Sequence, residues 1–123
     1  MSNGGKMAGG CLCGGVRFTL ERPVSSFGAC HCEMCRRWTS GPYLAHDCGE
    51  NVRFDGEEYI QRYKSSDWAE RGFCKICGSN LFYFVIQTGH FIMSIGALDN
   101  PDGLKMKSQI FIDEKPDCYD FAN

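Results

Sequence analysis

The spacing of the cysteines constrains this chain more than any other feature of its sequence. Seven of its nine cysteines fall into three close groups, Cys11-x-Cys13, Cys30-x-Cys32-x-x-Cys35 and Cys74-x-x-Cys77. Thiols separated by one or two residues can converge on one metal ion, whereas the cysteines of disulfide frameworks tend to be scattered. The pattern therefore predicts a protein clipped together by metal ions, with reduced thiols and a cytoplasmic location.

Length and charge narrow the class of protein. A chain of 123 residues is expected to form one domain. Its net charge of −2 and pI near 5.9 offer no basic footprint for phosphate backbones, so we expect no nucleic-acid partner. The sequence shows no secretory signal pattern and no apolar run near the ~20 residues that span a bilayer, so we expect no membrane partner.

Short apolar segments separated by glycine- and proline-containing turns predict a mainly β fold of short antiparallel strands. The segment at 80–86 is apolar throughout, which is typical of a central strand buried on both faces. Residues 65–72 are polar and are expected to form a connection. Residues 1–9 predict a flexible tail before a single zinc-binding domain over 10–123. Further strands are expected at 16–20, 43–46, 52–54, 58–64, 91–95 and 105–112.

The first and third cysteine groups together supply four thiols from two short turns about 60 residues apart. Cys11, Cys13, Cys74 and Cys77 thus predict a closed structural zinc site, which would tie together segments distant in sequence. The alternative is that one or more of these thiols is a free cysteine of the core.

The middle group, Cys30, Cys32 and Cys35, is left with three thiols. A zinc ion held by three protein ligands keeps a position for water or substrate and acts as a Lewis acid. The alternative is closure by a fourth ligand. Cys48 is the first candidate for closure, and His31, His46 and Cys118 are weaker ones. Because His31 stands between two ligands, we expect its side chain to point away from the metal.

The cysteine groups and their surroundings resemble the glutathione-dependent formaldehyde-activating enzyme family, which includes centromere protein V-like proteins and has the Mss4-like β fold. The resemblance covers nearly the whole chain. It is carried by residues 10–18 (GCLCGGVRF), 30–36 (CHCEMCR), 65–66, 71–79 (RGFCKICGS) and 110–116 (IFIDEKP).

The resemblance implies two zinc ions per chain. In this family the four outer thiols hold a structural zinc, here Cys11, Cys13, Cys74 and Cys77, and the three-thiol group holds a catalytic zinc, here Cys30, Cys32 and Cys35. The activity that names the family joins glutathione to formaldehyde by forming a carbon–sulfur bond. The resemblance therefore implies a carbon–sulfur lyase or synthase-like enzyme that acts on a small thiol adduct.

A substrate such as glutathione carries carboxylates, for which Arg36 is the first candidate contact, with Arg37 and Arg71 as alternatives. Trp38 and Tyr43 are candidates for the pocket wall or for the core. Two other functions are compatible with the same cysteines: a non-catalytic, zinc-stabilised module that binds a protein, and a zinc or redox buffer. A second site closed by Cys48 would favour the binding module.

Overall fold

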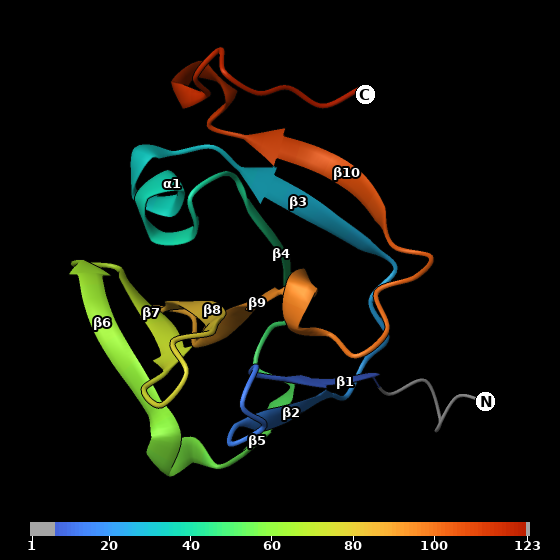
Figure 1. Ribbon diagram of the computed structural model, residues 1–123, viewed down its shortest axis with the longest axis vertical. Helices are drawn as coiled ribbons and strands as arrows, with labels where there is room; N and C mark the ends of the chain where they lie inside the picture. Colours follow the sequence, from blue (N-terminus) through green and yellow to red (C-terminus); the bar gives the residue numbers. More distant parts are fainter. Residues whose placement is uncertain (1–6, 123) are drawn as a thin grey trace.

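The computed structural model describes residues 7–122, which form two β-sheets and one α-helix, α1 (Glu33–Thr39) (Figure 1). The small sheet has the order β1-β2-β5, with β1 Met7–Gly10, β2 Arg17–Leu20 and β5 Val52–Asp55. The large sheet has the order β10-β3-β4-β9-β8-β7-β6, with β10 Lys105–Ile110, β3 Ser26–Cys30, β4 Tyr43–Asp47, β9 His90–Ser94, β8 Asn80–Val85, β7 Ala69–Cys74 and β6 Ile60–Ser66. Three short 3-10 helices complete the described elements, η1 Glu57–Tyr59, η2 Ile95–Ala97 and η3 Ile112–Glu114.

The mainly β class predicted from the sequence is confirmed, with one difference in strand direction. Strand β10 pairs with β3 in parallel, whereas every other strand pair in the described residues is antiparallel. Because β3 and β10 lie far apart in the sequence, no hairpin turn constrains their direction. Within residues 7–122, no helix is long and apolar enough to cross a membrane.

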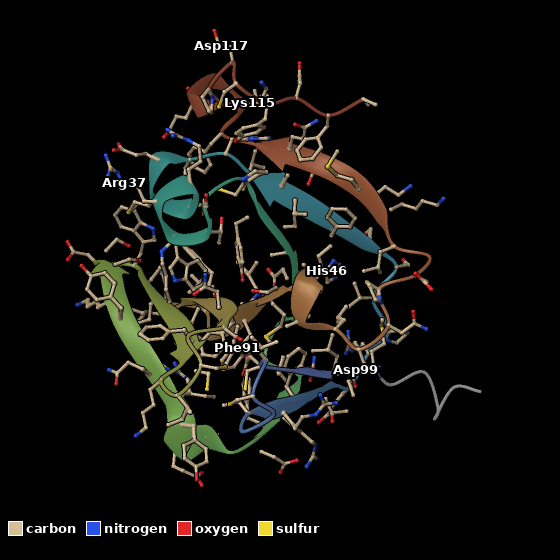
Figure 2. The ribbon with its side chains drawn as sticks, in the orientation of Figure 1. Arg37, His46, Phe91, Asp99, Lys115 and Asp117 are labelled. Atoms are coloured by element: carbon tan, nitrogen blue, oxygen red, sulfur yellow. The ribbon has the colours of Figure 1, made fainter. Side chains whose placement is uncertain are left out.

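An aromatic cluster joins the two sheets. Phe18 and Phe54 face each other across β2 and β5, and the Phe54 ring lies 5.5 Å from the ring of Phe82 and 5.3 Å from that of Phe91. Figure 2 shows Phe91 between the small sheet and the large one. Phe18 and Phe82 are fully buried, so this contact between the sheets is the centre of the hydrophobic core.

The N-terminal boundary differs from the expected one. Residues 7–9 were expected to belong to a flexible tail, but Met7–Gly10 forms β1, paired with β2. Gly9 is buried, and a Cβ atom there would overlap the Ala97 carbonyl and the Phe18 ring. Glycine at this position lets two backbone segments approach closely. The same residue type is also typical of flexible segments, which is why the sequence predicted a tail here. Residues 1–6 of the expected tail lie outside the described residues.

The expected connection at 65–72 is correct only at 67–68, because 65–66 belongs to β6 (Ile60–Ser66) and 69–72 belongs to β7 (Ala69–Cys74). A tight turn at 66–69 joins β6 to β7 as a hairpin, and Ala69, Arg71 and Gly72 are buried. The strand was missed because charged residues normally indicate exposed positions, whereas the Arg71 side chain is packed inside the protein. The strand expected at 58–64 begins later, at Ile60, because 57–59 forms η1, and the strand expected at 105–112 ends earlier, at Ile110.

Gly72→Ala is predicted to destabilise the protein by about 1–3 kcal/mol, because the added Cβ would fall on the Phe82 ring in the core. The measurement is the urea unfolding midpoint of the variant beside the parent. Gly96→Ala is the matched control, since a Cβ at Gly96 has nothing within 4 Å. Equal midpoints for the two variants would contradict this account of the packing.

Candidate metal centres

Four thiols from two distant turns meet beside the core and are called the outer cluster. Cys11 and Cys13 follow β1, Cys74 ends β7, and Cys77 lies in the turn before β8. Their sulfur atoms all lie within 4.8 Å of one another, with 3.6 Å from Cys11 to Cys13 and 3.8 Å from Cys13 to Cys74. Tetrahedral coordination with metal–sulfur bonds of ~2.3 Å places sulfurs about 3.8 Å apart. The outer cluster therefore fits a four-thiolate metal site.

Backbone N–H groups stabilise thiolates in the first turn of the outer cluster. Val16 donates its N–H to Cys11 Sγ at 3.3 Å, and Gly15 donates to Cys13 Sγ at 3.4 Å. The Gly15 N–H favours the Cys13 thiolate, but the other three thiols of the cluster and burial together outweigh it and raise the pKa of Cys13 to about 11. Charge repulsion among the thiols would be relieved by a bound cation.

Ser79 connects the two turns of the outer cluster. Its hydroxyl accepts the Leu12 N–H at 2.9 Å and lies 3.3 Å from Cys77 Sγ. The Ser79 hydroxyl and backbone N–H together lower the pKa of Cys77 to about 5. Sequence reasoning gave Ser79 no role, although it stands two residues after a predicted ligand.

Three thiols form a second group, the inner cluster, at the junction of β3 and α1. Cys30 ends β3, Cys32 is the N-cap of α1, and Cys35 lies in the first turn of the helix. Their sulfurs lie within 4.8 Å of one another, and Cys32 Sγ accepts the backbone N–H of Cys35 at 3.4 Å. A strand end followed at once by a helix start thus brings the three thiols of the C-x-C-x-x-C segment together.

Arg71 is the buried cation of the inner cluster. Its guanidinium lies 5.0 Å from the Trp38 ring and 4.9 Å from the Tyr83 ring, and the residue is 4% exposed. Arg71 Nη1 donates to Cys35 Sγ at 3.6 Å, and Nε donates to the Ser65 hydroxyl at 3.2 Å. A buried guanidinium pointed at a sulfur favours the thiolate form of that sulfur.

The inner thiols share charge unequally. The hydrogen bond from Cys30 and then the guanidinium of Arg71 lower the pKa of Cys35 to about 6. Cys30 shows the opposite effect, because the Cys35 thiolate and burial raise its pKa. Of this pair, the Cys35 thiolate is therefore favoured at neutral pH in the protein alone, and loading a cation would favour the Cys30 thiolate as well.

None of the four alternative ligands joins the inner cluster, and no other His, Cys, Asp or Glu of residues 7–122 does. Cys48 Sγ contacts the His46 carbonyl at 3.5 Å and packs against the core between the sheets, where burial raises the pKa of Cys48 to about 11. Cys118 is exposed on the C-terminal segment. The structure therefore does not place Cys48 at the inner cluster as a fourth ligand.

His31 points away from the inner cluster, as predicted. Its ring nitrogens lie 2.9 Å from the Tyr119 hydroxyl and 2.8 Å from Gln109 Oε1. The residue is fully buried, and it fastens the C-terminal segment and β10 to the start of α1. Its role is therefore structural support behind the inner cluster.

A cavity of about 410 Å³ opens beside the inner cluster, and all three thiols contribute to its wall. Arg71 and Tyr43 line this cavity, whereas Arg36 and Trp38 do not. Arg36 instead donates its Nε to the His31 carbonyl at 3.1 Å. Of the arginines considered from the sequence, Arg71 is the one that the fold places at the inner cluster, because the β6–β7 hairpin turns its side chain inward.

Arg71→Gln is predicted to shift the titration of Cys35 to higher pH, since it removes the cation that stabilises the Cys35 thiolate. The test is the pH dependence of Cys35 alkylation by iodoacetamide, followed by peptide mass spectrometry with the inner cluster free of metal. Arg62→Gln is the control, because Arg62 lies over Phe82 and Phe84 instead. An unchanged inflection in Arg71→Gln would refute the assigned role.

Comparison with known proteins identifies the family of this chain. Residues 6–114 match the family model described as glutathione-dependent formaldehyde-activating enzyme. A Schizosaccharomyces pombe protein described as an uncharacterized lyase is 37% identical over 117 residues, which cover 94% of this chain and 85% of that protein. A Rhodobacter sphaeroides crystal structure, 22% identical, aligns with a TM-score of 0.65 over 82% of this chain and 100% of that chain, and supports the fold alone. The family resemblance seen in the sequence is confirmed, and the chain belongs to the glutathione-dependent formaldehyde-activating enzyme family.

Proposed function

We propose that the protein is a zinc-dependent carbon–sulfur lyase that forms and cleaves the adduct of a small thiol with formaldehyde at the inner cluster. The observation that carries the proposal is the meeting of Cys30, Cys32 and Cys35 at the wall of a cavity, with no fourth side-chain ligand from residues 7–122. Family membership and a relative described as a lyase support the same reaction class.

The donor sets fit zinc at both clusters. In this proposal the outer cluster holds a structural ion with four thiolates, and the inner cluster holds a catalytic ion with three. A zinc ion at the inner cluster would supply Lewis acidity that lowers the pKa of a substrate thiol. Thiolate ligands make this a soft site, which favours sulfur over oxygen as the incoming atom.

The reaction needs no external oxidant or reductant. In the synthetic direction a bond forms between the thiol sulfur and the formaldehyde carbon, the C=O double bond becomes a single bond, and the thiol proton ends on the former carbonyl oxygen. The reverse reaction returns both substrates. Glutathione is the thiol that the family resemblance suggests, which makes S-(hydroxymethyl)glutathione the reference product.

The walls of the cavity position the reactants and restrict water. Tyr83 and Ile92 provide apolar surface beside the thiols, and the Tyr43 hydroxyl is turned away to donate to the Ile92 carbonyl at 2.9 Å. Burial raises the pKa of Tyr43, so its hydroxyl stays protonated and bound to the backbone. Arg36 stays a proposed contact for a part of the substrate that projects outside the cavity.

We also propose a cytoplasmic location, because none of the nine cysteines, all within the described residues, forms a disulfide. Reduced thiols are needed for both proposed metal sites. The alternative functions, a protein-binding module and a zinc or redox buffer, keep the clusters but require no rate enhancement. Measurements of metal content and of reaction kinetics together distinguish these three functions.

Cys32→Ser is predicted to reduce bound zinc from two ions per chain to one while the fold is retained, and to abolish catalysed exchange between formaldehyde and thiols. Zinc is measured by atomic emission, and exchange by NMR as the rate above buffer with glutathione and other thiols, because the uncatalysed addition is appreciable. Cys48→Ser, outside both clusters, is the control that keeps two ions. Two zinc ions in Cys32→Ser, or no acceleration by the parent, would defeat the proposal.

Cys13→Ser is predicted to remove the outer ion and to lower the free energy of unfolding by several kcal/mol, since the outer cluster joins the small sheet to β7. Chemical denaturation followed by circular dichroism measures the change. Cys118→Ser provides the control because Cys118 is exposed and belongs to neither cluster. A stable Cys13→Ser protein with two ions would contradict the structural role.

A further inference from the structure

The mouth of the inner cavity is surrounded by exposed apolar side chains from three separate segments. Trp68 comes from the β6–β7 turn, Met34 from α1, and Ile110 and Phe111 from the end of β10, and all four line the cavity. Figure 1 shows α1 between the tip of β10 and the β6–β7 hairpin. Trp68 is 57% exposed and Phe111 is 53% exposed. Large apolar side chains that gather at one opening indicate an apolar ligand group.

The backbone at Phe111 supports this reading of the mouth. Phe111 has φ +54°, in the left-handed region that residues other than glycine seldom adopt. The conformation is unfavourable for a bulky side chain, and here it starts η3 and leaves the ring on the cavity wall. The wall is therefore apolar at its outer edge as well as beside Tyr83, Val85 and Ile92.

The charged residues of the cavity do not suit an anionic ligand. Apart from the inner thiols, only Arg71, Glu33 and Glu114 are charged among the lining residues of the described chain, and Arg71 is buried against Cys35. Glu114 Oε1 accepts the Glu33 backbone N–H at 3.0 Å, so its carboxylate fills the start of α1. Arg37 pairs with Glu33 at 2.9 Å but lies on the outer side of α1 (Figure 2). A ligand carboxylate in this mouth would meet carboxylates and apolar groups.

We propose that this cavity selects aldehyde adducts of small apolar thiols over those of anionic thiols such as glutathione, with Trp68 and Phe111 holding the apolar tail and Glu114 disfavouring a carboxylate. This inference rests on the proposed function and names the substrate class of the same site. Each CH₂ group of the tail that is fully buried favours binding by about fourfold. A carboxylate at the same place loses water without gaining a cationic partner.

The test compares ligands of similar size with the zinc-loaded protein. For binding, the ligands are methyl propyl sulfide and 3-(methylthio)propanoate, which cannot form the adduct, and the readout is tryptophan fluorescence, since Trp68 lines the cavity. For catalysis, the thiols are 1-propanethiol, 3-mercaptopropanoate and glutathione, each measured by NMR exchange with formaldehyde and normalised to its own uncatalysed rate.

We expect at least tenfold tighter binding of the neutral sulfide and at least tenfold higher kcat/KM for 1-propanethiol than for either anionic thiol. Equal or reversed preferences would overturn the inference while leaving the lyase proposal intact. Preferential binding of the neutral sulfide without acceleration of any thiol would uphold the inference about the cavity and defeat the lyase proposal. The binding measurement thus decides the inference whatever the kinetics show.

Substitutions at Glu114 and Phe111 test whether these two residues cause the preference for neutral ligands. Glu114→Gln, which keeps an oxygen for the Glu33 N–H, is expected to narrow the neutral-to-anionic ratio at least threefold, whereas Asp113→Asn, outside the lining, leaves it unchanged. Phe111→Ala is expected to weaken binding of methyl propyl sulfide at least threefold, and Ile112→Ala is its control, equally exposed but outside the lining. Equal effects of each variant and its control would remove these residues from the proposal.

Discussion

The convergence of thiols from distant turns is the constraint on which the rest of the structure depends. The outer cluster brings the turn after β1 to the end of β7, beside the aromatic contact of Phe54 with Phe82 and Phe91, so a metal ion held there would fasten the small sheet to the large one. In a domain of this size the hydrophobic core is limited, and a cross-link of this kind adds stability that packing alone supplies with difficulty.

Repulsion among the thiols of the inner cluster is opposed by a buried cation. Three thiols at one point repel one another as they ionise, and Arg71 partly compensates by donating to Cys35. The guanidinium packs against the rings of Trp38 and Tyr83. The same rings separate it from water, which strengthens its interaction with the sulfur. The arrangement favours an anionic cluster that binds a soft cation and leaves the surrounding cavity mainly apolar.

Much of the site could be predicted from the sequence, because cysteines that bind one metal ion occur at characteristic short spacings. The seven grouped cysteines met in the two clusters that their spacing predicted, and the expected orientation of His31 was also correct. Strand prediction succeeded where apolar residues were continuous or alternated, as in β2 and β8. It failed for β1 and β7, since glycines and a buried arginine resemble loop residues when their partners are unknown.

The sequence by itself determined the family, the mainly β class and the division of the cysteines into groups, because each depends on residues close together along the chain. Only the tertiary structure decided the parallel pairing of β10 with β3, the exclusion of Cys48 from the inner cluster and the burial of Arg71 beside Cys35. It also brought Glu114 and Phe111 to the cavity that the thiols share. These features depend on contacts between segments tens of residues apart, and local patterns carry no information about which segments meet.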